Sequence, residues 1–167
     1  MVDTRILLAI DDSVASRRAV NYVAKFVGRR RGFRLCLVHV LSPLPAGLLE
    51  HGGSENPQKE TELEAELKTE QERWISDAKK AAQKSLSKAS ATLRNAGVPA
   101  RNVQAIFCEP AEGRAAAEDI LRMARECKCQ TVVAGRESVS WFHELFSQDL
   151  AEELMRCGKG FSVWLIE

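Results

Sequence analysis

The first β-α unit of the chain lies in the stretch 5-RILLAIDDSVASRRAV-20. Residues 5–10 form an apolar run with the length of a buried strand, and the polar residues 11–13 end it. Ser13 or Ser16 then supplies a side-chain oxygen suited to cap the first free N–H groups of a helix. The apolar positions that follow, up to Val27, recur at the spacing of one helix face. The stretch therefore predicts a strand that passes through a short polar loop into a helix.

The same alternation continues along the chain. Strands that alternate with helices of about ten or more residues form β-α-β units with right-handed crossovers and a parallel sheet. We therefore predict a single α/β domain over residues 1–167, with an open, doubly wound sheet of five parallel strands. The further strands are expected at 34–40, 103–108, 130–134 and 161–166, and the further helices at about 60–95, 120–127 and 145–155.

The composition excludes two broad classes of protein. Hydrophobic residues make up 45% of the 167 residues and charged residues 28%, which is ordinary globular usage and excludes a disordered chain. The 24 basic and 23 acidic residues leave a formal net charge of +1. A net-basic surface is therefore absent, and we expect neither nucleic acid nor a membrane as a partner.

The cysteines and the N-terminal residues indicate a compartment. The five cysteines are odd in number and lie within or beside apolar runs, as small buried thiols do in a reducing environment. The apolar stretch near the N-terminus has only about half a dozen residues, which is shorter than the core of a signal peptide. The sequence therefore predicts a cytoplasmic protein.

Three short motifs, in order and spacing, resemble the universal stress protein family. They are the stretch 6-ILLAIDDS-13 with its continuation 16-SRRA-19, the stretch 38-VHV-40, and the stretch 132-VVAGR-136. The resemblance covers essentially the whole chain. It implies the strand order 3-2-1-4-5, dimerisation through the last strand, and an ATP pocket at the point where the strand order reverses.

The resemblance also implies where a nucleotide would be held. The adenine would lie near Asp11, which Ala9 and Ile10 lead into, and near Val40. The phosphates would lie on a loop that in the family reads Gly, two residues, Gly, nine residues, Gly, and then Ser or Thr, because glycines let backbone N–H groups approach phosphate. Those four positions fall on Gly135, Ser138, Gln148 and Asp149.

Only Gly135 keeps the family's residue in this loop. Asp149 places a carboxylate where a hydroxyl is expected, and a carboxylate repels a triphosphate. Glu137 adds to this repulsion, whereas Arg136 or Arg114 could compensate for it. The sequence therefore predicts a protein without strong ATP binding and without a required cofactor, although ATP or another adenine nucleotide stays open as a ligand.

Several side chains have two interpretations. Asp11 contacts a base or a metal, or it is an acidic flank of the following helix, where the helix dipole favours it; Asp12 is interpreted as helix-start chemistry. The pair Asp11-Asp12 resembles a receiver-domain site, but no Asp ends the third strand and no Lys ends the fifth. Trp141-Phe142 either fills the vacated pocket or contacts a partner.

The thiols and other reactive groups do not indicate an enzyme. Cys127 and Cys129 lack a second pair at zinc spacing, which Cys108 and Cys157 would have to supply, so we interpret them as small buried residues at a helix end. No Ser, Cys or Lys is visibly paired with a base, so we assign no catalytic residue and no metal. These residues therefore favour a binding module over an enzyme and leave the question of enzymatic activity open.

We predict a stress-response or regulatory protein that acts as a dimeric binding module for an unknown protein partner. The apolar run 161–166 is an edge strand by topology, and uncovered edges pair with other chains, which predicts a homodimer through this strand. The first alternative is an ATP-binding switch with weak ATPase or autophosphorylation activity, in which Arg136 and Ser138 contact phosphate. The second alternative is a binder of a nucleoside or nucleoside monophosphate.

Overall fold

The computed structural model describes residues 4–50, 52–110, 114–136 and 150–167. It contains five strands, and each lies within one residue of an apolar run predicted from the sequence. Ser138, Gln148, Asp149 and the pair 141–142 lie outside the described residues. The strands are Thr4–Ala9 (β1), Phe33–Val40 (β2), Val103–Cys108 (β3), Thr131–Gly135 (β4) and Ser162–Ile166 (β5).

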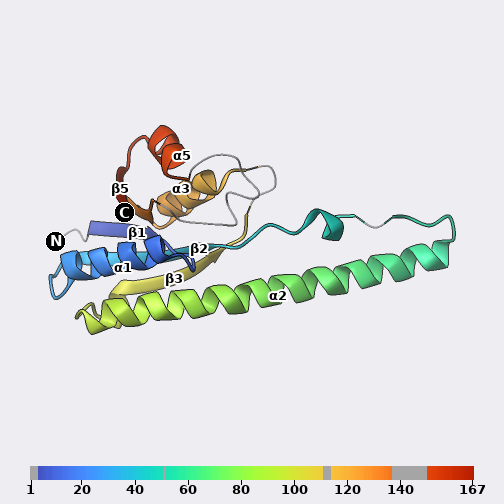
Figure 1. The fold of residues 1–167 in the computed structure, drawn as a ribbon, viewed down its shortest axis with the longest axis horizontal. Coiled ribbons are helices and arrows are strands. Elements are labelled where there is room, and N and C mark those ends of the chain that lie inside the picture. Colours follow the sequence, from blue (N-terminus) through green and yellow to red (C-terminus); the bar gives the residue numbers. More distant parts are fainter. Residues whose placement is uncertain (1–3, 51, 111–113, 137–149) are drawn as a thin grey trace.

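All five strands join in one parallel sheet with the order β3-β2-β1-β4-β5, as predicted (Figure 1). Thr4 of β1 lies opposite Phe33 of β2, and Thr131 of β4 lies opposite Ser162 of β5. The central strands β1 and β4 are apolar on both faces because helices cover both sides of a doubly wound sheet. The strand order reverses between β1 and β4, where such folds bind ligands.

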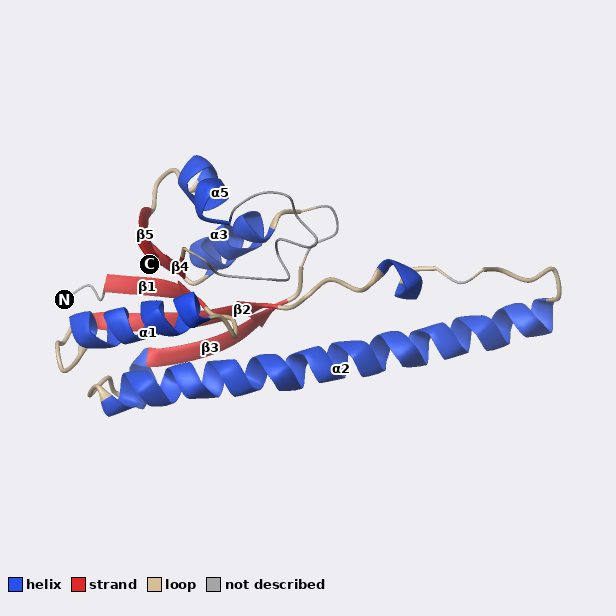
Figure 2. Cartoon of the chain, viewed as in Figure 1, coloured by secondary structure: helices blue, strands red, loops and turns tan. Residues whose placement is uncertain are grey.

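In the part of the chain that the structure describes, four helices cover the sheet, two on each face (Figure 2). α1 (Val14–Val27) and α2 (Pro57–Asn95) pack on one face, and α3 (Ala116–Glu126) and α5 (Leu150–Cys157) pack on the other. Short 3-10 helices lie at Ala46–Leu48 (η1) and Ala100–Asn102 (η2). The largest fully buried side chains come from the strands and from these four helices. The core therefore has two layers, one on each face of the sheet.

The start of α1 follows the sequence prediction. Ser13 is the N-cap: its Oγ accepts a hydrogen bond of 2.9 Å from the Ser16 N–H. The helix ends at Gly28, which has φ +44° and donates its N–H to Ala24 O. The cap and the C-terminal glycine therefore fix the length of α1 and the direction from which it leaves β1.

The helix α2 extends far beyond the sheet (Figure 1). Asn56 caps its first turn by accepting a hydrogen bond of 3.0 Å from the Gln58 N–H. No residue of α2 before Ala82 is buried. The segment between β2 and α2 runs along this projecting part, and the Gln71 side chain donates a hydrogen bond of 2.6 Å to Leu48 O. Only the C-terminal part of α2 therefore belongs to the core.

Among the described helices, none is long and apolar enough to cross a membrane.

Candidate functional site

The loops that follow β1, β2 and β4 meet at the carboxyl edge of the sheet, and the backbone continues to pair there beyond the strands. The Ile10 N–H donates to Val38 O at 2.8 Å, and the Leu41 N–H donates to Cys108 O at 2.9 Å. The Arg136 N–H donates to Ile166 O at 2.8 Å. These bonds hold the first residues of each loop at fixed positions relative to one another.

Asp11 organises the turn into α1. Its Oδ1 accepts a hydrogen bond of 2.7 Å from the Ser13 N–H, and its own N–H donates to Ser16 Oγ at 3.1 Å. The side chain is half-buried. Asp11, and not Asp12 as predicted, therefore stabilises the turn before the helix. One of its carboxylate oxygens already accepts a hydrogen bond from the backbone of this turn.

Asp12 connects this loop to α2. Its carboxylate accepts a hydrogen bond from the Ser85 hydroxyl, and its backbone oxygen accepts one of 2.8 Å from Arg17 Nη1. Ser85 is 5% exposed and Asp12 is exposed, so the bond lies at the boundary of the core. Ser85 is not among the site residues predicted from the sequence. The signal available was a serine within the apolar stripe of this helix, between Ala82 and Ala89.

Gly135 ends β4 where the start of α1 approaches it closely. A Cβ atom at this position would lie 2.4 Å from the carbonyl carbon of Ala15. The next residue, Arg136, forms an ion pair with the carboxylate of Glu167, and both side chains are exposed. Packing of α1 against β4 is therefore sufficient reason for glycine at this position.

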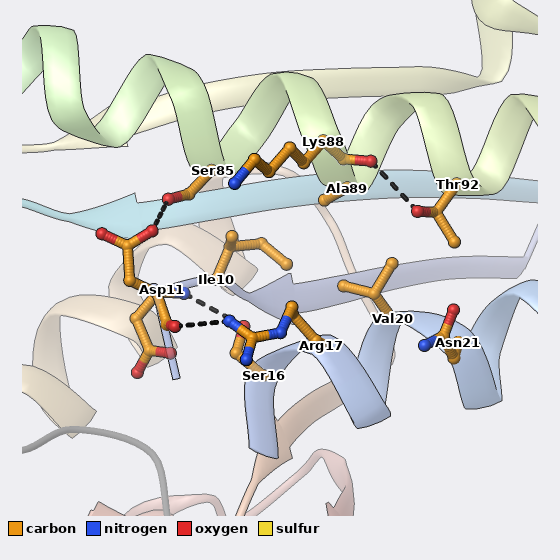
Figure 3. Close-up of a pocket in the computed structure, with 11 residues that line it drawn as sticks. Ile10, Asp11, Ser16, Arg17, Val20, Asn21, Ser85, Lys88, Ala89 and Thr92 are labelled. Carbon is orange, nitrogen blue, oxygen red and sulfur yellow. Dashed lines mark hydrogen bonds between the residues drawn. The ribbon is translucent and has the colours of Figure 1, made fainter. Parts of the chain in front are cut away.

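A cavity of about 110 Å³ lies between α1 and the C-terminal half of α2, behind the loop that follows β1 (Figure 3). Pockets for drug-sized ligands usually have about 300–1,000 Å³, so the cavity is too small for a nucleotide. Of the predicted site residues, Ile10 and Asp11 line it. It is also lined by Asp12, Ser16, Arg17, Val20, Asn21, Ser85, Lys88, Ala89 and Thr92.

The structure divides the predicted base-binding residues between the two faces of the sheet. Ile10 packs in the layer under α1 and α2, whereas Val40 and Ala9 pack in the layer under α3 and α5. Val40 is 6% exposed and Ala9 is half-buried. The part of the chain that the structure describes therefore holds these residues at one edge of the sheet but not around one cavity.

His39 lies near this edge on β2. Its Nδ1 atom is buried and has no hydrogen-bond partner among the described residues. Burial lowers the pKa of His39 below its usual value of 6.5, and the nearby carboxylates of Asp11 and Asp12 oppose this effect only in part. The imidazole is therefore neutral at physiological pH. Within the described ranges, no group of three or more His, Cys, Asp or Glu side chains is arranged to hold a metal ion.

An open parallel sheet in the order 3-2-1-4-5, with loops gathered at the switch between β1 and β4, defines a doubly wound α/β protein. The model of the universal stress protein family matches residues 4–158, and the chain belongs to this family.

Solved structures of universal stress proteins share the fold. A protein of this family from Burkholderia pseudomallei has a TM-score of 0.66 at 20% identity, over 98% of this chain and 95% of the other. The protein from Archaeoglobus fulgidus in complex with dAMP has a TM-score of 0.56 at 18% identity, over 100% of both chains. A family member from Arabidopsis thaliana with AMP bound has a TM-score of 0.57 at 13% identity, over 98% of this chain and 90% of the other. A comparison with curated proteins finds no match.

Proposed function

We propose that this chain is a regulatory module of the stress response that acts as a homodimer and does not bind ATP strongly. The observation that argues against strong ATP binding is the negative charge around the end of β4. In the sheet, β4 lies between β1 and β5. Carboxylates follow both neighbours: Asp11 and Asp12 after β1, and Glu167 after β5. A triphosphate approaching Gly135 would meet carboxylates from both sides.

The cations at this edge do not reverse that charge. Arg136 is paired with Glu167, and Arg17 is bonded to the backbone oxygen of Asp12. Among the described residues that directly follow β1, β4 and β5 or bond to them, these two guanidinium groups stand against three carboxylates. A triphosphate would have to displace Glu167 from Arg136 to gain one cation, and Glu167 would remain tethered beside it.

The phosphate loop of the family supports the same proposal. Glycines in such a loop let backbone N–H groups approach phosphate, but the close contact with Ala15 already accounts for Gly135. In the sequence, Gln148 and Asp149 replace the glycine and the hydroxyl residue at the end of the loop. The one glycine that remains is therefore no evidence for phosphate binding.

The edge of β5 supports dimerisation. The Ser162 N–H and the Ile166 carbonyl both point to β4, so in a parallel strand the N–H groups of Val163 and Leu165 point to the outer edge. The adjoining surface is aromatic: Trp164 forms an edge-to-face contact with Tyr22, which is 48% exposed. A two-fold axis perpendicular to the sheet would pair β5 with its copy and join the two sheets, since uncovered edges favour pairing.

A second function is favoured by the relatives. The Archaeoglobus fulgidus structure contains dAMP and the Arabidopsis thaliana structure contains AMP. A nucleoside monophosphate carries less charge than a triphosphate, so the carboxylates beside Gly135 oppose it less. The second candidate is therefore binding of an adenine nucleoside monophosphate at the carboxyl edge of the sheet.

Isothermal titration of the full chain with ATP and Mg²⁺, AMP and adenosine tests the ligand. We expect no ATP signal at micromolar concentrations, and a signal from AMP or adenosine alone would support the second candidate. Micromolar ATP binding would overturn the proposal and favour the ATP-binding switch. The double variant Gln148→Gly with Asp149→Ser is the matched gain-of-function control, and we expect it to bind ATP more tightly than the parent.

Sedimentation velocity of the Leu165→Pro variant tests the dimer. Proline removes the outward N–H of β5 and leaves the hydrogen bonds between β4 and β5, so we expect a monomer where the parent is a dimer. Leu165→Ala is the matched control: it shortens the same side chain and keeps the N–H, so it should remain dimeric. A parent that is monomeric throughout the concentration series would refute dimerisation.

A further inference from the structure

Three thiols from distant parts of the sequence meet at the amino edge of the sheet, opposite the carboxyl-edge loops. Cys36 lies in β2, and Cys127 and Cys129 lie in the turn between α3 and β4. We call these three residues the thiol cluster. The Sγ atoms of Cys36 and Cys127 are 3.0 Å apart, and Cys36 also forms a side-chain hydrogen bond with Cys129. Cys36 is therefore the shared neighbour of both other thiols.

The turn after α3 directs two of these thiols toward β2. The Cys129 N–H donates to Ala124 O at 2.8 Å, and the Lys128 N–H donates to Arg125 O at 3.0 Å. This pair of bonds is the Schellman arrangement, which requires a left-handed residue between Cys127 and Cys129. Lys128 takes this conformation with φ +54°. The backbone thus reverses between the two cysteines, and both side chains reach Cys36.

The thiol cluster lines a cavity of about 80 Å³ with cationic side chains at its rim. Arg5, Arg34 and Arg101 line the same cavity, and Arg5 Nη1 donates a hydrogen bond of 3.0 Å to Cys127 O. Cys36 and Cys129 are buried, whereas Cys127 is half-buried. A small oxidant can therefore reach Cys127 first, in an electropositive surrounding of the kind in which thiols react.

The hydrogen bond between Cys36 and Cys129 separates the protonation of these two thiols. This bond, together with burial, raises the pKa of Cys36. The same bond lowers the pKa of Cys129, and the charge of Arg5 acts in the same direction. Cys36 therefore keeps its proton in the resting state while Cys129 ionises more easily.

We propose that the thiol cluster is a modification site for hydroperoxides, at which Cys127 is oxidised and forms an intramolecular disulfide with Cys36. In the first step, the Cys127 sulfur attacks the peroxide O–O bond, which gives a sulfenic acid at Cys127 and releases water or an alcohol. In the second step, the Cys36 sulfur attacks the Cys127 sulfur. The S–O bond breaks, and the hydroxyl leaves with the Cys36 proton as water. The peroxide is reduced by two electrons, and the two thiols supply them.

The disulfide would connect two segments that are separated by 91 positions in the sequence. It would tie β2, near the middle of the sheet, to the turn that leads from α3 into β4. A thiol reductant would reverse the change by thiol–disulfide exchange. The site is independent of nucleotide binding because no carboxyl-edge residue takes part in it.

Peptide mapping by mass spectrometry after limited hydrogen peroxide treatment and alkylation of the remaining thiols tests this site. We expect a Cys36–Cys127 linked peptide whose mass is two hydrogen atoms below the sum of the two reduced peptides. Treatment with dithiothreitol should remove this linked peptide. Cys157→Ser is the matched control, since Cys157 is also half-buried and lies outside the thiol cluster. This variant should form the linked peptide at the parental rate.

The variant Cys127→Ser should slow the oxidation of Cys36 by about tenfold or more, because the two remaining thiols of the cluster, Cys36 and Cys129, are buried. Circular dichroism checks that this variant folds, and Cys127→Ala provides a second substitution at the same half-buried position. A link between Cys127 residues of two chains would overturn the proposal. So would oxidation of Cys157 before Cys127, or a parent in which Cys36 and Cys127 both stay reduced at peroxide concentrations that oxidise free cysteine.

Discussion

The end of β4 lies so close to the start of α1 that a methyl group on Gly135 would overlap the main chain of Ala15. A Cβ atom at Gly135 would lie 2.4 Å from the carbonyl carbon and 2.7 Å from the carbonyl oxygen of Ala15. Both contacts are with atoms that belong to a capped helix, so neither side can move without disturbing the packing of α1 on the sheet.

We therefore expect Gly135→Ala to lower the free energy of unfolding by about 1–3 kcal/mol, as overpacking does in a tight core. Urea unfolding without any nucleotide measures this change. Gly47→Ala is the control, because a Cβ at Gly47 would have no neighbour within 4 Å. If Gly135→Ala leaves the stability unchanged, the packing explanation for this glycine is wrong.

Ser85→Ala removes the hydrogen bond that joins α2 to the Asp12 carboxylate. We expect a loss of about 1–2 kcal/mol, because hydrogen bonds to charged groups contribute more than neutral ones and Asp12 remains accessible to water. Thermal or urea unfolding of the variant measures it. Ser87→Ala, on the exposed face of the same helix, removes a bond of 3.1 Å from Gln83 and should change the stability by much less. Equal effects of the two variants would contradict a structural role for the Ser85–Asp12 bond.

Lys128→Gly should stabilise the fold by about 1 kcal/mol, because glycine takes a left-handed conformation without the steric cost that an L side chain pays. Lys128 is exposed and has φ +54°. Lys128→Ala is the control, since it removes the charged side chain but keeps the Cβ, and it should leave the stability unchanged. Urea midpoints at neutral pH give both values, and a Gly variant less stable than the Ala variant would refute the strain at this turn.

The half-buried imidazole of His39 makes the stability depend on pH in a defined direction. Because its folded-state pKa lies below the unfolded value of 6.5, the unfolded chain binds the proton more readily. This stabilising contribution is fully present above pH 6.5 and is lost as the pH falls from there through the folded pKa. In His39→Phe we expect the loss of stability below pH 6.5 to be smaller than in the parent, as measured by urea unfolding across a pH series. Parallel curves for the two proteins would show that His39 does not titrate on unfolding in this range.

The strands could be predicted from the sequence because helices cover both faces of a parallel sheet. Each strand is then buried on both sides and appears in the sequence as a short apolar run. The run 34–40, for example, corresponds to the strand Phe33–Val40. The start of α1 could be predicted because a cap depends on neighbours in the sequence: Ser13 and Ser16 are three positions apart. The strand order came from the resemblance to the family, and the structure confirms it.

The contacts of the candidate site could not be predicted in the same way. Ser85 and Asp12 are separated by 73 positions, and only the packing of α2 on α1 brings them together. The same holds for the thiols. The sequence indicates that Cys127 and Cys129 are buried residues at a helix end. Their neighbour Cys36 belongs to a strand that lies 91 positions before Cys127 in the sequence, so the sequence does not show the contact. At Gly135 the motif suggested phosphate binding, whereas the reason visible in the structure is a steric one.

The projecting helix α2 has a consequence for how the protein diffuses. At 1.5 Å per residue, its 39 residues extend to about 58 Å, and much of this length lies outside the sheet. Such a shape experiences more friction than a sphere of equal mass, so a single copy should elute early from a gel-filtration column, at an apparent mass well above 18.5 kDa. Elution volume alone would therefore imitate self-association, and the number of copies should be counted by a method that measures mass independently of shape.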